Sequence, residues 1–150
     1  MNRKPVSSTI AIGDQPTEAD LEVLKAEGYR GVVNLRHEGE PDQTLSPAEE
    51  EQRVRALGMD YLHVGIGGAP LTESSVSAVC EFLDKHADEP VLVHCKLGGR
   101  AAALVLLHKA RAEGWDADEA LGQGEAMGLQ VTGKLRDLVE AYLVGHNLKG

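Results

Sequence analysis

The stretch VLVHCKLGGRAAALVLL, Val91 to Leu107, contains two apolar runs separated by a loop with two glycines. The first run, Val91 to His94, has the length and composition of a buried strand. The second run begins a helix that we expect from Arg100 to Glu113, and it is apolar on all sides, which predicts a buried helix. Cys95 opens the loop between the two runs, and Arg100 closes it. The segment therefore predicts a strand, a short loop and a helix, with reactive side chains at both junctions.

Strands and helices are expected to alternate along the rest of the chain. The predicted strands cover residues 8–13, 30–36, 60–66 and 91–94. Three helices are expected to begin after the capping residues Thr17, Ser46 and Thr72, and two further helical stretches follow residue 114. Such alternation predicts a mostly parallel sheet covered on both faces. We expect one α/β domain over residues 1–150, with four to five strands flanked by helices.

Ligands of such sheets bind beyond the carboxyl ends of the strands. In the predicted order, this edge carries Arg36 and His37, the glycines at 65–68, and the loop from Cys95 to Arg100. Arg36 and His37 are therefore candidates for contact with a substrate. His63 lies within a predicted strand, which favours a structural role.

The loop after Val91–His94 has the features of an anion-binding site. Its backbone N–H groups and the helix N-terminus favour negative charge, and glycines allow the tight backbone. Comparable placements lower a cysteine pKa from about 8.5 to roughly 3.5–7.5. We expect Cys95 to be a nucleophile and Arg100 to bind a tetrahedral oxyanion. Strand alternation predicts that His94 and Cys95 face opposite sides, so His94 would support the loop through its backbone or have a buried structural role. The residues whose amides would form the anion-binding loop are Lys96, Leu97, Gly98 and Gly99.

Composition restricts the choice of ligand and compartment. The chain has 15 basic and 24 acidic residues and a formal net charge of −9, which disfavours binding to nucleic acid or to anionic membranes. No apolar run is long enough for a signal peptide or a membrane span, so a cytoplasmic location is expected. The histidines show no metal-ligand spacing, so neither a metal nor a cofactor is predicted. Nothing in the sequence indicates an oligomeric state.

Two other features are assigned structural roles. Cys80 lies on the apolar stripe of a predicted helix, so it is expected to fill the core. The charged run at residues 48–55 predicts a solvated helix face with ion pairs from Glu49 to Arg53 and from Glu51 to Arg55.

The segment HCKLGGR resembles the active loop of cysteine-dependent protein phosphatases, in which five residues separate the cysteine from the arginine. Together with GDQPTEADLEVLKAEGYRGVVNLRHEGE and MDYLHVGI, it resembles the bacterial beta-lactamase-hydrolase-like, phosphatase-like domain family over about residues 9–113. The strongest motifs are NLR..GE and the cysteine loop. The resemblance implies a protein-tyrosine-phosphatase-like fold, Cys95 as nucleophile and Arg100 as anion ligand. It also implies a link to sulfur metabolism, since the family includes domains found beside sulfur-metabolising enzymes.

The sequence departs from the phosphatase pattern in three ways. Only four residues separate Cys95 from Arg100, a loop length similar to that of rhodanese-type sulfurtransferases, and Ala101 stands where the phosphatase arginine would be. The segment GIGGAPLTESS, residues 65–75, lacks the aspartate that would protonate the leaving group, and its only carboxylate, Glu73, is expected to act at a helix start. No serine or threonine directly follows Arg100, where Ala101, Ala102 and Ala103 stand. Substitute acids from neighbouring loops are Asp14, Glu38 and Asp42, whereas Asp60 is expected at the opposite edge.

Three functions remain open from the sequence. The first is a slow cysteine-dependent phosphatase that hydrolyses phosphotyrosine or a small phosphoester through a thiophosphate on Cys95. The second is a sulfurtransferase or persulfide carrier that uses the same cysteine, which the short loop favours. The third is a non-catalytic anion-binding module. The expected partner is thus a phosphorylated or sulfur-bearing small molecule or peptide.

Overall fold

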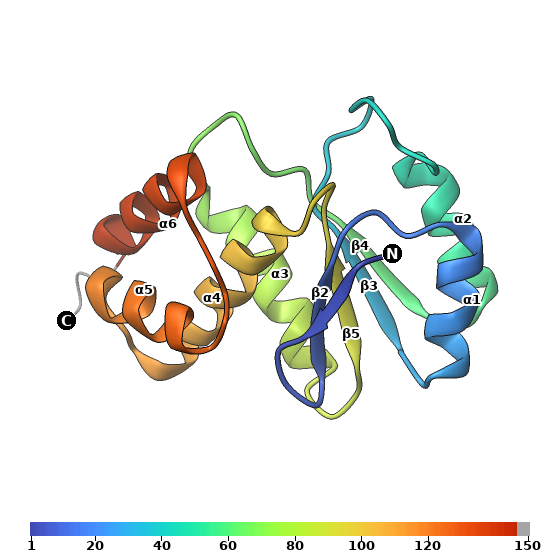
Figure 1. The fold of residues 1–150 in the computed structure, drawn as a ribbon, viewed down its shortest axis with the longest axis horizontal. Coiled ribbons are helices and arrows are strands. Elements are labelled where there is room, and N and C mark those ends of the chain that lie inside the picture. Colours follow the sequence, from blue (N-terminus) through green and yellow to red (C-terminus); the bar gives the residue numbers. More distant parts are fainter. Residues whose placement is uncertain (147–150) are drawn as a thin grey trace.

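A five-stranded sheet forms the centre of the molecule in the computed structural model, which describes residues 1–146 (Figure 1). The strands lie in the order β1-β2-β5-β3-β4, and β1 is antiparallel to β2 while all other pairs are parallel. Their bounds are β1 (Arg3–Pro5), β2 (Ile10–Gly13), β3 (Gly31–Asn34), β4 (Asp60–His63) and β5 (Val91–His94). The expected α/β fold with a mostly parallel sheet is therefore confirmed, and the strand that carries the cysteine loop lies at its centre.

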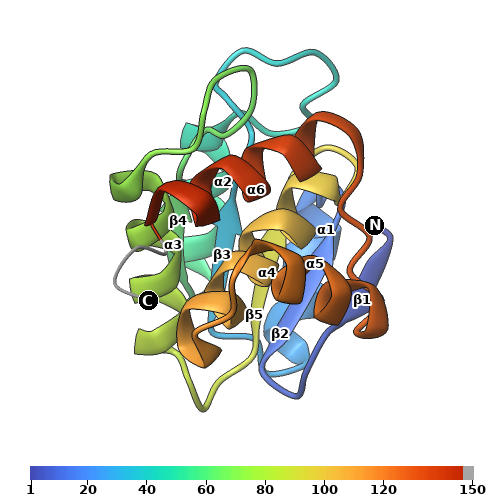
Figure 2. The ribbon, with the colours of Figure 1, turned by 90° about the vertical axis from the view of Figure 1, so that its left-hand side faces the viewer.

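Helices cover both faces of this sheet (Figure 1). One face carries α1 (Glu18–Ala26) and α2 (Pro47–Ala56). The other face carries α3 (Glu73–Lys85) and α4 (Gly99–Glu113). Figure 2 shows α5 (Ala117–Ala126) and α6 (Gly133–His146) as an outer layer packed on α4. None of the helices in residues 1–146 is long and apolar enough to cross a membrane.

Side-chain alternation along the strands produces two separate cores. In β5, Leu92 packs with the residues under α1 and α2. Val91 and Val93, together with Cys95 just after the strand, pack with those under α3 and α4. The helix α4 is buried on nearly all sides, as its uniform apolar sequence predicts, since it lies between the sheet and the outer helices.

The predicted helix caps are confirmed. Thr17, Ser46 and Thr72 each have extended backbone, and each hydroxyl accepts a hydrogen bond from the backbone amide three residues later. These bonds satisfy amides that a helix start would otherwise leave without a partner. The caps therefore set where α1, α2 and α3 begin, and with them the lengths of the loops that precede these helices.

The structure corrects several boundaries and adds one strand. The strand expected over 8–13 begins at Ile10, and the helix expected from Arg100 begins at Gly99. The strands expected over 30–36 and 60–66 end at Asn34 and His63, and the remaining residues form loops. The antiparallel edge strand β1 was not expected, because its sequence, RKP, has no apolar alternation. It is stabilised by backbone pairing with β2, which a side-chain pattern does not reveal.

The charged run at 48–55 is only partly a solvated face. Arg55 forms the predicted ion pair with Glu51 at 2.9 Å. Glu49 instead caps α2 through Ser46, and Arg53 pairs with Glu18 at 3.1 Å, so the predicted pair between Glu49 and Arg53 is wrong. Glu50 lies in the interior and is fully buried.

Candidate active site

Three loops meet at the carboxyl edge of the sheet, at the top of Figure 1. They follow β3, β4 and β5 and cover residues 35–46, 64–72 and 95–98. Because the three strands are parallel and adjacent, their carboxyl ends bring these loops together. The candidate residues of the sequence analysis lie in these loops and at the start of α4.

The Cys95 sulfur lies inside the loop that joins β5 to α4. The backbone amide of Gly98 donates a hydrogen bond to Cys95 Sγ at 3.0 Å, and the thiol residue is 1% exposed. This curl requires a left-handed backbone at Gly98, with φ of 102°, which favours glycine. The helix α4 begins at the next residue, so its N-terminus lies beside the sulfur. The Gly98 amide and the N-terminus of α4 both favour an anion bound at this loop.

Arg100, in the first turn of α4, forms a two-point ion pair with Glu40. Its Nη1 atom lies 2.7 Å from Glu40 Oε2, and its Nη2 atom lies 3.0 Å from Glu40 Oε1. Nη1 also donates to the backbone carbonyl of Ile66 at 3.0 Å. Arg100 is thereby tied to the loops after β3 and β4 as well as to its own helix.

This pairing shifts the pKa of both partners. The hydrogen bonds from Arg100 lower the pKa of Glu40 to about 2, against the opposing effect of burial, so the carboxylate is ionised at neutral pH. The same bonds raise the pKa of Arg100, and the neighbouring Cys95 sulfur adds to the rise. Arg100 is therefore a fixed positive charge beside the thiol.

Arg36 and His37, the residues predicted to contact a substrate, lie in different environments. Arg36 is fully buried, and its guanidinium donates to Glu40 Oε1 and Gln15 Oε1, each at 2.9 Å. It therefore faces the interior and reaches no solvent-exposed surface. His37 is exposed, and its Nε2 atom lies 2.8 Å from the backbone oxygen of Gly67, in the loop after β4.

His94 is fully buried on the face of the sheet opposite to Cys95, as strand alternation predicts. Its Nε2 atom lies 2.6 Å from Glu50 Oε2, and its Nδ1 atom lies 3.3 Å from the backbone oxygen of Cys95. The ring therefore contacts the cysteine through the backbone only.

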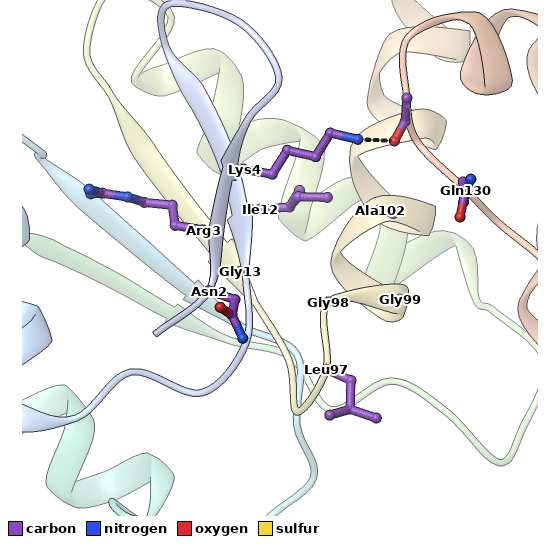
Figure 3. Close-up of a pocket in the computed structure, with 11 residues that line it drawn as sticks. Asn2, Arg3, Lys4, Ile12, Gly13, Leu97, Gly98, Gly99, Ala102 and Gln130 are labelled. Carbon is purple, nitrogen blue, oxygen red and sulfur yellow. Dashed lines mark hydrogen bonds between the residues drawn. The ribbon is translucent and has the colours of Figure 1, made fainter.

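The other side chains of the cysteine loop point away from the sulfur. Lys96 lies 3.5 Å from Asp42, and Leu97 is 84% exposed. On the flank of the loop, a cavity of about 470 Å³ lies between the β1–β2 hairpin and α4 (Figure 3). Its lining includes Lys4, Ile12, Leu97, Gly98, Gly99 and Gln130.

The carboxylates considered as proton donors are engaged elsewhere or lie in solvent. Asp14 accepts hydrogen bonds from Asn2, and Glu38 is exposed. Glu73 begins α3 and accepts from the Tyr142 hydroxyl at 2.5 Å, which lowers its pKa. Asp60 lies at the opposite edge, as predicted, at the amino end of β4.

Cys80 is confirmed as a core residue. It is 5% exposed on the inner face of α3, and burial raises the pKa of its thiol to about 11. Both cysteines are free thiols, and only Cys95 lies at the carboxyl edge.

The site thus contains a cysteine at the end of the central parallel strand β5, followed by a helix with an arginine in its first turn, in the order that the sequence resemblance implies. A family model described as "DSP-PTPase phosphatase fused to NAD+ Kinase" matches residues 2–137. The chain belongs to this family. The resemblance to phosphatase-like domains found in the sequence is therefore confirmed.

Individual relatives agree with the family assignment. A beta-lactamase hydrolase-like protein of Agrobacterium fabrum is 32% identical over 105 residues, which cover 70% of this chain and 24% of the relative. A candidate phosphatase of the DUF442 group from Shewanella putrefaciens has a TM-score of 0.75 at 22% identity and covers 95% of this chain and 87% of its own. PTPMT1 in complex with PI(5)P has a TM-score of 0.75 at 19% identity and covers 95% of both chains. The chain spans about a quarter of the length of the curated relative, and the structural matches show the fold.

Sequence reasoning assigned no role to Glu40 or Gln15, and it wrongly placed Glu50 on a solvated helix face. Glu40 is the last residue of the NLR..GE motif, but the motif does not say which side chain it meets. Glu50 shares an inward face of α2 with Pro47 and Val54, at spacings of three and four residues. That spacing was a usable signal, because a solvated acid would not be expected on the buried stripe.

The two carboxylates with the largest downward pKa shifts, Glu40 and Asp60, make folding stability depend on pH. The folded-state pKa of Glu40 is about 2. The folded-state pKa of Asp60 is also about 2: burial raises this pKa, and hydrogen bonds from His86 and Lys85 lower it by more. Both values lie below the ordinary ones of 4.5 and 3.8, so this stabilisation is complete above about pH 4.5 and is lost as the pH falls toward 2. We expect the unfolding free energy in urea to fall over this window. Glu40→Gln and Asp60→Asn should each flatten the fall, and unchanged slopes in both would contradict the assignment.

Proposed function

We propose that the chain is a cysteine-dependent phosphatase that hydrolyses phosphate monoesters through Cys95. The phosphatase-like fold and the family support the reaction class. The observation that carries the proposal is the placement of Arg100, which Glu40 holds beside the cysteine loop at 2.7 and 3.0 Å. A thiol, an array of amides and a fixed guanidinium are the groups that a thiophosphate mechanism needs.

The reaction would proceed in two steps. The Cys95 thiolate attacks phosphorus, so that an S–P bond forms while the bond to the ester oxygen breaks. The ester oxygen leaves and takes a proton from solvent. Water then attacks phosphorus, the S–P bond breaks, and phosphate and the thiolate are released.

Arg100 retains an edge for the transferred group. A guanidinium has five N–H donors. Glu40 binds the edge formed by Nη1 and Nη2, and the Ile66 carbonyl accepts from Nη1. The Nε hydrogen and the second Nη2 hydrogen form the adjacent edge, which suits two oxygens of a tetrahedral anion. Glu40 thus orients Arg100 without occupying the whole fork.

The surroundings favour esters with good leaving groups. The 65–72 part of the loop after β4 has no carboxylate, and the pairing with Arg100 keeps Glu40 ionised, so neither supplies a proton to the leaving oxygen. General acid help is worth about 10²–10⁴-fold. Phenolic esters such as phosphotyrosine need this help less than alkyl esters do, because a phenolate is the more stable leaving group.

A substrate panel tests this proposal. We expect turnover of p-nitrophenyl phosphate and a phosphotyrosine peptide, with a phosphoserine peptide slower by about 10²-fold or more. PI(5)P and NADP⁺ belong in the panel, because PTPMT1 is seen with the former and NAD⁺ kinase, the fusion partner in the family description, forms the latter. Phosphate release from none of the five would contradict the proposal. Equal rates for tyrosine and serine esters would contradict the absence of an acid.

The short loop favours sulfur transfer as a second candidate function. Four residues between Cys95 and Arg100 enclose less space than the five of the phosphatase pattern, which favours a smaller guest. With thiosulfate, the Cys95 thiolate would attack the outer sulfur, displace sulfite and pass the sulfur to cyanide. Intact mass after thiosulfate treatment distinguishes the two reactions, since only this candidate adds one sulfur atom at Cys95. If neither reaction occurs, the non-catalytic anion-binding module remains.

The neighbouring residues have distinct roles in the proposed site. His37 is exposed beside Gly67, whose own position borders the Arg100 side chain, so His37 is the proposed contact with the organic part of the substrate. Arg36 is fully buried, so its proposed role is to hold Glu40, to which its Nε atom donates, and not to contact the substrate.

A further inference from the structure

A chain of buried and partly buried hydrogen bonds begins at His94, the residue before the proposed nucleophile. His94 Nε2 lies 2.6 Å from Glu50 Oε2. The other oxygen of Glu50 accepts from Gln15 Nε2 at 2.9 Å. His94 and Glu50 are both fully buried, and they come from β5 and α2. A buried carboxylate is costly unless its oxygens are paired, and here each oxygen has one partner.

The same chain continues to Arg100, at the other end of the cysteine loop. Gln15 Oε1 accepts from Arg36 Nη1 at 2.9 Å. Arg36 Nε donates to Glu40 Oε1 at 2.9 Å, and Glu40 holds both terminal nitrogens of Arg100. Arg36 is fully buried, and its Nη2 atom also donates to the backbone oxygen of Pro41 at 2.5 Å.

The two ends of this chain bound the reactive loop. Side chains from β5, α2, the segment after β2 and the loop after β3 therefore join the residue before Cys95 to the anion ligand. Gln15 lies at its middle, where its side-chain amide donates to one half and accepts from the other. A break at this point would separate the His94 half from the Arg100 half without touching the thiol.

We propose that Gln15 and Glu50 are positioning residues that fix Arg100 relative to Cys95 through this chain. The inference rests on the proposed function for its consequence in turnover, but the ordering of Arg100 is measured without a substrate. Neither side chain is among the hydrogen-bonding partners of the Cys95 sulfur or of Arg100, so both act through Arg36 and Glu40.

An exchange of the two side chains tests the proposal. Gln15→Leu keeps the approximate volume and removes both bonds, whereas the double variant Gln15→Glu with Glu50→Gln restores them. In the exchanged pair, the carboxylate now at position 15 accepts from Arg36 and from the amide now at position 50, and the oxygen of that amide accepts from His94. Gln123→Leu, on the exposed side of α5, is the matched control. Glu50→Gln alone replaces Gln15→Leu if the latter does not fold, since an amide has one accepting oxygen for two donors.

The readouts are the ¹⁵N order parameter of the Arg100 Nε–H group and kcat/KM on p-nitrophenyl phosphate, at a temperature where circular dichroism shows every variant folded. We expect Gln15→Leu to lower the order parameter and to reduce kcat/KM by about tenfold. The exchanged pair should recover most of both, and Gln123→Leu should change neither. A purely structural role would lower the melting temperature and leave Arg100 as ordered as in the wild type.

The outcomes separate this inference from the proposed function. An unchanged Arg100 order parameter in Gln15→Leu overturns the inference, whatever the activity. Loss of order that the exchanged pair does not recover also overturns it. If Gln15→Leu loses the order of Arg100 and the exchanged pair recovers it, while the wild type hydrolyses no phosphoester, the inference is supported and the proposed phosphatase activity is contradicted.

Discussion

Cys95→Ala is expected to lower the rate of phosphate release by at least about 10³-fold. The reason is that the chain's other thiol lies away from the anion loop. Cys95 Sγ accepts from the Gly98 amide at 3.0 Å and lies beside Arg100, whereas Cys80 is buried in α3. Alanine removes the atom that would form the bond to phosphorus. The measurement is release of inorganic phosphate, together with intact mass during turnover of the wild type.

Cys80→Ala is the matched control for this loss. This variant also removes the thiol of a buried cysteine, but at a position where burial raises the pKa of the thiol to about 11. We expect it to keep wild-type turnover and to lose a small amount of stability. Retained activity in Cys95→Ala, or equal losses in the two variants, would show that Cys95 is not the nucleophile.

Arg100→Lys should reduce kcat/KM by about 10²–10³-fold while the protein stays folded. Lysine keeps a positive charge near Glu40, so the ionised carboxylate retains a partner. It has no planar fork, however, and cannot bind Glu40 with one edge and two substrate oxygens with the other. The reduction is therefore expected in the rate of phosphoryl transfer, and the affinity for vanadate should fall as well.

Arg111→Lys on the same helix controls for the loss of a guanidinium. Arg111 lies at the far end of α4, where it donates to Ser77 Oγ at 3.1 Å, away from the cysteine loop. We expect its kcat/KM to equal that of the wild type. If Arg100→Lys behaved like Arg111→Lys, the two-edge arrangement would have no part in turnover.

Local chemistry allowed much of this fold to be predicted. Thr17, Ser46 and Thr72 each cap a helix through a bond to the amide three residues later, so the signal and the contact lie in one short segment. Strand alternation likewise placed His94 and Cys95 on opposite faces. The edge strand β1 escaped prediction, because its backbone pairing with β2 leaves no pattern in its side chains.

For the site, the sequence by itself determined the strand, loop and helix that present Cys95 and Arg100. Those residues are neighbours along the chain, and their spacing already limits the chemistry. Only the tertiary structure decided that Glu40 forms an ion pair with Arg100 and that Arg36 is buried. It also decided that the buried side chain of Glu50 contacts His94. The physical reason is that these contacts join residues up to 60 positions apart. The neighbouring sequence of a charged side chain does not indicate whether that side chain is solvated or paired in the folded protein. Which of the two occurs depends on whether folding brings a partner of opposite charge to the same buried place.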